Sequence, residues 1–120
     1  MSLVVYGIKH CDSMKKAFAW LDAHQIAYTF VDFKISPPTE TQVETWLTGV
    51  GDMLVNTRGP SYRQLPDATR ADFTGPRRIA AIVAKPTLIK RPLLVNGSIM
   101  TVGFAPENWG SIPFLFTTDT

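Results

Sequence analysis

The chain has 120 residues, of which 45% are hydrophobic, so it is long enough to bury a core without metal ions or disulfides. Twelve basic and ten acidic residues give a net charge of +2, which is too small to indicate direct nucleic-acid binding. No apolar stretch approaches the length of a membrane span, the N-terminus lacks the features of a signal peptide, and one cysteine excludes an internal disulfide. We therefore expect a cytoplasmic monomer that binds neither membranes nor nucleic acid directly.

The first third of the chain predicts a strand, a helix and a second strand. Residues 3–8 form a short apolar run rich in β-branched side chains, typical of a buried strand, and Gly7 near its end indicates a close approach of the backbone or a bend. Residues 14–24 carry apolar side chains at helical spacing, and residues 27–33 are again aromatic and β-branched. A right-handed βαβ unit is therefore expected.

The middle of the chain, residues 38–86, predicts a helical insertion within the same domain. Thr39 and Gln42 have the spacing of a capping box, which marks the start of a helix. Gly49 and Gly51 are expected to end this helix, because glycine favours helix C-termini. We interpret the insertion as part of a single domain that spans the whole chain.

The last part of the chain contains the clearest turn signal. Two apolar, β-branched runs flank Asn96-Gly97, the preferred pair of a type I′ turn, so an antiparallel hairpin is expected. Residues from 106 onward predict a short final helix. The order βαβ, helical insertion and ββα corresponds to an α/β fold with a thioredoxin-like, mixed four-stranded sheet and an inserted helical subdomain.

Cys11 is the residue best placed for chemistry, because it lies between the first strand and the first helix. Unpaired N–H groups and the helix dipole favour a thiolate at that position, and the thiolate is the nucleophile. Lys15 and Lys16 would add to this effect, whereas Asp12 would oppose it. A lone cysteine is more often a small buried residue, but the neighbouring residues here are polar. We predict a pKa below the free value of about 8.5.

Two arginines lie in segments that the predicted fold brings toward Cys11. Arg91 directly precedes Pro92 and the first strand of the hairpin. An X-Pro bond is cis in only about one case in twenty, but the thioredoxin plan places a cis-proline opposite the active cysteine. We therefore predict a cis Arg91–Pro92 bond that faces Cys11. Arg58 would by itself be a solvated surface residue, but with Arg91 and the helix start it would complete an anion pocket.

Five segments of the chain, taken in order, resemble the arsenate reductase (ArsC)/Spx family. They are VYGI and CDSMKKA within residues 5–17, VNTRG in residues 55–59, IKRPL in residues 89–93 and VGF in residues 102–104. The family contains glutaredoxin-dependent arsenate reductases, the Spx transcription regulators and a less characterised branch that is thought to use glutathione. The chain is most similar to this third branch.

The resemblance implies a set of catalytic residues. In the arsenate reductases a cysteine attacks arsenate and three arginines hold the anion. Cys11, Arg58 and Arg91 match the cysteine and two of these arginines, so we predict catalytic roles for them. The third arginine is absent from residues 102–106, and the histidine expected four residues before the cysteine is Gly7. Both departures weaken the arsenate pocket.

The leading hypothesis is a glutathione-linked monothiol reductase or thiol-transfer protein with Cys11 as the nucleophile. Its ligand would be glutathione, as co-substrate, or a small oxyanion, with glutaredoxin as a further partner and with no metal or bound cofactor. Four more residues are expected to contact the substrate: Asp12, Ser13, Lys15 and Pro92. The competing hypothesis is an Spx-like regulator that binds RNA polymerase without catalysis, although this chain lacks the Cys-x-x-Cys switch that Spx proteins often carry. A third is an adaptor with a vestigial site.

Overall fold

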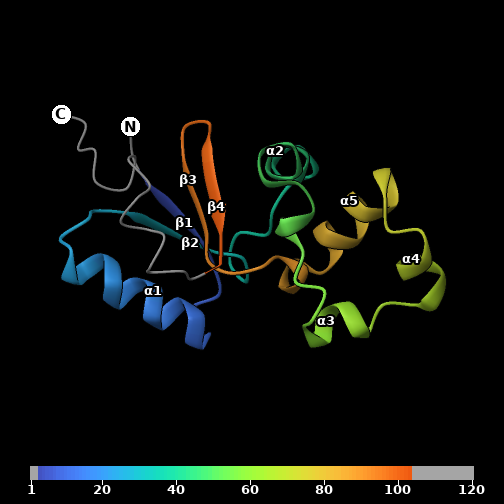
Figure 1. Cartoon of the computed structure of the whole chain (residues 1–120), viewed down its shortest axis with the longest axis horizontal. Coiled ribbons are helices and arrows are strands. Elements are labelled where there is room, and N and C mark those ends of the chain that lie inside the picture. The colour runs from blue at the N-terminus through green and yellow to red at the C-terminus, as the bar shows by residue number, and fades with distance from the viewer. Residues whose placement is uncertain (1–2, 104–120) are drawn as a thin grey trace.

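Four strands and the helices around them make up residues 3–103, the part of the chain that this computed structural model describes. The elements follow in the order β1 (Val4–Gly7), α1 (Asp12–Ala23), β2 (Thr29–Asp32), α2 (Glu40–Val50), η1 (Gly51–Leu54), α3 (Pro60–Arg63), α4 (Asp67–Ala71), α5 (Gly75–Ala84), η2 (Pro86–Leu88), β3 (Leu93–Asn96) and β4 (Ile99–Val102), where η denotes a 3₁₀ helix. Figure 1 shows α1 on one side of the strands and the helical insertion on the other. Within the described range, no helix has the length and apolar character needed to cross a bilayer.

The strands form one mixed sheet in the order β2-β1-β3-β4, which confirms the predicted thioredoxin-like α/β fold. β1 runs parallel to β2 and antiparallel to β3, and β3 forms an antiparallel hairpin with β4. At one end of the sheet Tyr6 pairs with Leu93, which pairs with Val102. The carboxyl ends of β1 and β4 therefore lie beside the start of β3.

Alternate residues of the strands supply two separate cores, because successive side chains point to opposite faces of a sheet. Val5 and Leu94 belong to the core that α1 covers, whereas Tyr6 and Leu93 contact the core of the helical insertion. Three residues of α1 at helical spacing are fully buried against the sheet: Met14, Ala17 and Leu21. The apolar stripe predicted from the sequence is thus the packed face of α1.

The insertion begins with the predicted capping box. The Thr39 side chain accepts a hydrogen bond from the backbone of Gln42 at 3.1 Å, and the Gln42 side chain accepts one from the backbone of Thr39 at 3.0 Å. Val43 and Trp46 are the buried residues of the helix that follows. The Trp46 ring lies 4.8 Å from that of Tyr6, which joins the insertion to β1.

The predicted end of α2 is partly wrong, because Gly49 lies inside the helix and only Gly51 terminates it. Gly51 has a φ of 64°, in the left-handed region that glycine adopts readily. Gly49 has a packing role instead: a Cβ at that position would lie 2.5 Å from the sulfur of Met100. The absent side chain leaves room for β4 against α2.

The hairpin is confirmed, but its turn lies one residue later than predicted. Asn96 pairs with Ile99, so the two loop residues are Gly97 and Ser98. Gly97 has a φ of 65° and Ser98 has no positive φ, which is the pattern of a type II′ rather than a type I′ turn. Asn96 is buried in the last pair of the ladder, and this pairing moves the turn.

The bounds of β2 and the helix α4 could not be set from local patterns. β2 is shorter than residues 27–33, because only Thr29–Asp32 pairs with β1. Helix α4 was not predicted, and since it has no buried residue it lacks the apolar stripe that would indicate it. α5 begins at Gly75 with proline in its first turn, a position that suits proline. The helix predicted from residue 106 onward lies outside the described residues.

Gly7 provides a test of the packing beneath the first strand. A Cβ at Gly7 would collide with the sulfur and terminal methyl group of Met14, which is fully buried. We expect Gly7→Ala to lower the free energy of unfolding in urea by about 1–3 kcal/mol, the usual cost of overpacking. The loss should shrink in a Met14→Ala background, because the colliding atoms are gone. An equal loss in both backgrounds would contradict this contact.

Candidate active site

Three chain segments meet at one end of the sheet and form the candidate site. Cys11 follows the carboxyl end of β1, and Arg91 precedes the start of β3, its antiparallel neighbour. Gly103 follows the carboxyl end of β4, where its N–H donates a 2.9 Å hydrogen bond to the Pro92 carbonyl. Residues that are separated by most of the chain thus become neighbours through strand pairing alone.

Cys11 is the N-cap residue of α1. Its backbone is extended, with φ −88° and ψ 138°, and its carbonyl accepts a 3.0 Å hydrogen bond from the N–H of Lys15. The N–H groups of the first helical turn have no partner within the helix. Those of Ser13 and Met14 lower the pKa of the Cys11 thiol. The start of α1 therefore favours the thiolate form of Cys11, as the sequence predicted.

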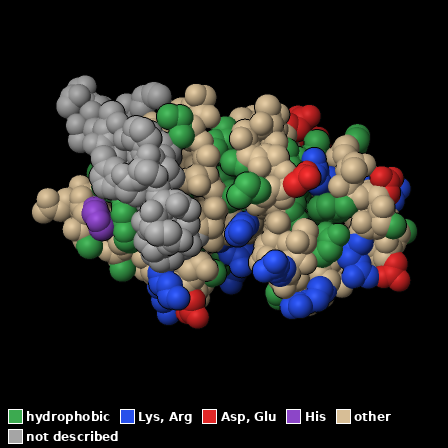
Figure 2. Space-filling view, in the orientation of Figure 1, with side chains coloured by type: hydrophobic (Ala, Val, Ile, Leu, Met, Phe, Trp, Pro, Cys, Tyr) green, Lys and Arg blue, Asp and Glu red, His purple; other side chains and the backbone are tan. Residues whose placement is uncertain are grey.

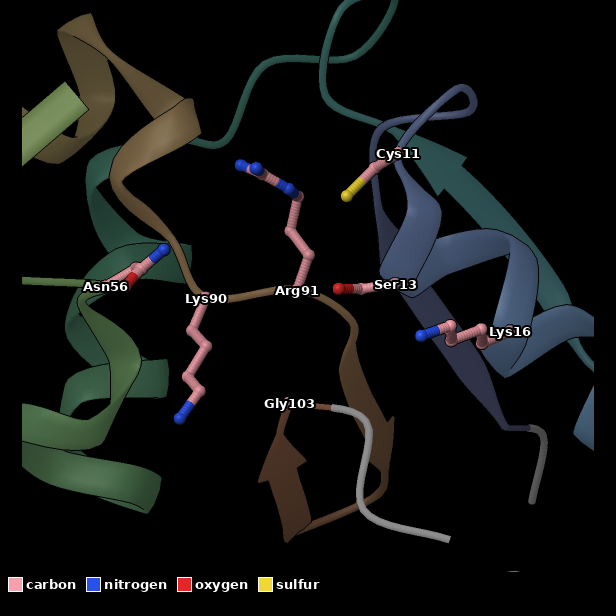
Figure 3. A pocket seen from close by; sticks show the side chains of 7 residues that line it. All are labelled: Cys11, Ser13, Lys16, Asn56, Lys90, Arg91 and Gly103. Atoms are coloured by element: carbon pink, nitrogen blue, oxygen red, sulfur yellow. The ribbon is translucent and has the colours of Figure 1, made fainter. Parts of the chain in front are cut away.

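Arg91 is the second group that acts on the thiol. Its Nη1 donates to the carbonyls of Thr87 at 3.0 Å and Ile89 at 3.4 Å, which fixes the guanidinium beside the cysteine. The N–H groups and the positive charge of the same side chain lower the pKa of the Cys11 thiol. The Arg91–Pro92 peptide bond is cis, as predicted, and Figure 3 shows the Arg91 side chain next to Cys11.

The pKa of the Cys11 thiol reflects a balance between burial and these donors. Partial burial raises the pKa, because it disfavours the charged thiolate. The hydrogen bond and positive charge of Arg91, together with the N–H groups of Met14 and Ser13, lower the pKa by more. The net pKa is lowered, in the direction predicted, and the thiolate is more populated near neutral pH than in a free cysteine.

The helical insertion forms part of the site through a short antiparallel contact between residues 54–56 and residues 88–90. Val55 forms a bridge with Ile89, the N–H of Asn56 donates to the Leu88 carbonyl at 2.9 Å, and the N–H of Lys90 donates to the Leu54 carbonyl at 2.7 Å. This contact places the side chain of Asn56 next to the segment that carries Arg91. The insertion therefore completes the site as well as covering the sheet.

A cavity of about 320 Å³ lies between these segments, within the size range of small-ligand sites. Figure 3 shows its lining residues, which are Cys11, Ser13, Lys16, Asn56, Lys90, Arg91 and Gly103. The lining has three cationic side chains and no carboxylate. Residues 3–103 also contain no cluster of His, Cys, Asp and Glu that would hold a metal ion. The cavity thus combines a nucleophilic thiol with a surface that suits an anion.

The structure brings together some of the predicted site residues and leaves others outside. Cys11, Ser13 and Arg91 line the cavity. Four do not line it: Asp12, Lys15 and Arg58 are exposed, and Pro92 is buried. The N–H of Arg58 donates to the side chain of Asn56 at 3.2 Å, so its loop adjoins the wall of the cavity. Roles for these four residues remain predictions.

Three lining residues were not singled out by the sequence: Asn56, Lys90 and Gly103. Lys16 was expected to favour the Cys11 thiolate but not to contact the substrate, although it is three residues beyond Ser13 and therefore shares its helix face. Asn56 and Lys90 reach the cavity through the contact between the insertion and the segment before β3, which no local pattern indicates. Gly103 depends likewise on the pairing of β4 with β3.

Comparison with known proteins gives matches over nearly the whole chain. The family model described as "ArsC family" matches residues 6–112. The solved structure of a YFFB protein has a TM-score of 0.87 and 38% identity, and the match covers 92% of this chain and 97% of that one. An arsenate reductase (ArsC) related protein from Brucella melitensis has a TM-score of 0.75 and 37% identity, with 93% and 94% covered. The global transcriptional regulator Spx of Streptococcus pneumoniae is 26% identical over 78% of this chain and 72% of that protein.

The reactivity of Cys11 should show its lowered pKa directly. Only the thiolate reacts with iodoacetamide, so the alkylation rate of the folded chain should rise with pH around a midpoint below that of a free cysteine. Arg91→Gln should move this midpoint to higher pH, because a hydrogen-bond donor and a positive charge are lost. Arg63→Gln, which removes an exposed arginine outside the cavity, is the matched control. A wild-type midpoint at or above the free value would contradict this account of the thiol.

Proposed function

This chain belongs to the ArsC family, and on that premise we propose that it is a glutathione-linked monothiol reductase or thiol-transfer protein. The observation that carries the proposal is the thiol of Cys11, which has a lowered pKa and lines a cavity with cationic side chains. Cys11 is the only cysteine of the chain, so a resolving thiol must come from another molecule. Glutathione, a small anionic thiol, meets both requirements.

The proposed reaction consists of two thiol–disulfide exchanges. The Cys11 thiolate attacks the glutathione sulfur of a mixed disulfide, the original S–S bond breaks, and the substrate leaves as a thiolate. Cys11 is then joined to glutathione by a new disulfide. A second glutathione thiolate attacks the glutathione sulfur of this disulfide, which releases the Cys11 thiolate and glutathione disulfide. The substrate sulfur is reduced and the sulfur of the one incoming glutathione is oxidised, so the electrons balance.

Arg91 and the helix start act at defined points of this cycle. They stabilise the Cys11 thiolate before the first exchange and again as it leaves in the second. A thiolate with a lowered pKa is a better leaving group, which speeds the second exchange. The exposed face of the cavity lets a large disulfide reach the sulfur, since Cys11 is only partly buried.

Turnover of a glutathionylated peptide tests the proposal. With glutathione and glutathione reductase present, the full chain should release the peptide thiol faster than glutathione alone does, in proportion to protein concentration. Cys11→Ser should abolish the acceleration, because the nucleophile is lost. Circular dichroism would verify that the variant folds. A wild-type rate equal to that of glutathione alone would refute the proposed activity.

Arsenate is a poor candidate for the substrate. The arginine expected after the last strand is absent from residues 102–106, and the side chain of Arg58 does not line the cavity. Each charge-assisted hydrogen bond contributes about 1.5–3 kcal/mol, so the loss of one contact weakens anion binding about tenfold or more. We expect little or no arsenate reduction in an assay coupled through glutathione and glutaredoxin. Turnover at an ordinary enzymatic rate would show that the pocket does not need this arginine.

A second candidate function is regulation by binding RNA polymerase, as in Spx. The similarity to the S. pneumoniae regulator favours it, because the match extends over most of both chains. The two functions place different demands on the thiol. Turnover requires Cys11, whereas binding to a partner would survive Cys11→Ser. Retention of polymerase by both the wild-type chain and this variant, without any turnover, would favour the regulator.

A further inference from the structure

Two lysines of the cavity take no part in the chemistry proposed above. Lys16 and Lys90 line it together with Cys11 and Arg91. Neither ammonium group has an ion pair or a hydrogen bond with any residue from 3 to 103, and no carboxylate is present in the lining. Each of the two charges is therefore available to a ligand.

The two lysines come from opposite walls of the cavity. Lys16 projects from α1, on the same face as Ser13, whereas Lys90 projects from the segment before β3 (Figure 3). In Figure 3, Arg91 lies between them. Figure 2 shows Lys and Arg side chains gathered between α1 and the insertion, on the face that it displays. A ligand with its reactive sulfur at Cys11 would occupy the same cavity as both cations.

Gly103 leaves space for the side chain of Lys90. It has a φ of 84°, and a Cβ there would lie 3.0 Å from Cε and 3.7 Å from Nζ of Lys90. A larger residue would push the lysine away from its present position. Gly103, at the end of β4, thus helps to determine the position of the Lys90 ammonium group at the cavity.

We propose that Lys16 and Lys90 determine specificity by binding the carboxylates of the thiol substrate. The inference rests on the proposed function and names its substrate class: thiols and disulfides that carry a carboxylate on each side of the reacting sulfur. Glutathione has this arrangement, with its thiol on the central residue and a carboxylate at each end. Neutral and cationic thiols lack the groups that the two lysines bind.

The expected effect is moderate, because both lysines are exposed to solvent. Ion pairs at exposed sites change equilibria and rates by about two- to fivefold, and salt screens them. The preference for an anionic disulfide should therefore decline as ionic strength rises. The reaction with a neutral disulfide should be unaffected by the same change.

A comparison of two disulfides tests the inference with the full chain. The rate at which Cys11 forms a mixed disulfide is measured by intact mass with glutathione disulfide and with the neutral bis(2-hydroxyethyl) disulfide. In each exchange the thiolate attacks one sulfur, and the other half leaves as a thiolate. The ratio of the two rates isolates recognition of the substrate, because a change in the pKa of Cys11 affects both reactions alike.

We expect Lys16→Gln and Lys90→Gln each to lower this ratio about two- to fivefold. Lys34→Gln is the matched control, since it removes one exposed charge outside the cavity and should leave the ratio unchanged. A wild-type preference for glutathione disulfide that both cavity variants retain would overturn the role of the lysines and leave the proposed function standing. A wild-type chain that reacts with glutathione disulfide no faster than a free cysteine would overturn both.

Discussion

The antiparallel pairing of β1 with β3 is the constraint on which the rest of the site depends. Tyr6 lies opposite Leu93, so the end of the first strand and the start of the third meet at one edge of the sheet. Cys11 follows one of these strands and Arg91 precedes the other. The nucleophile and the cation that stabilises its thiolate are thus brought together by backbone hydrogen bonds rather than by side-chain contacts.

The two faces of the sheet contribute to the site in different ways. On one face, α1 is held by its apolar stripe and supplies its N-terminus to Cys11. On the other face, the insertion packs around Trp46, and its residues 54–56 form backbone hydrogen bonds with residues 88–90. The cavity lies where these layers meet, so its walls belong to elements that pack independently. A change in either core would alter the distance between Lys16 and Lys90.

Within the cavity, burial and positive charge act on the thiol in opposite directions. Burial alone would keep Cys11 protonated, and a structural cysteine would be the outcome. Arg91 and the N–H groups of Ser13 and Met14 together outweigh burial, and the carbonyls of Thr87 and Ile89 hold the Arg91 guanidinium in place. A preorganised cation stabilises the thiolate without a further cost of ordering its side chain. The same arrangement leaves the exposed lysines free for a ligand.

The sequence by itself determined the type and order of most of the elements, although not helix α4, since periodicity and capping act over a few residues. It predicted Cys11 at a helix start, the cis bond before the third strand and the hairpin. Only the tertiary structure decided that Gly49 packs rather than terminates a helix, that Asn96 joins the ladder, and that Asn56 and Lys90 share a wall with the thiol. These outcomes depend on contacts between residues far apart in the chain, which local patterns do not encode.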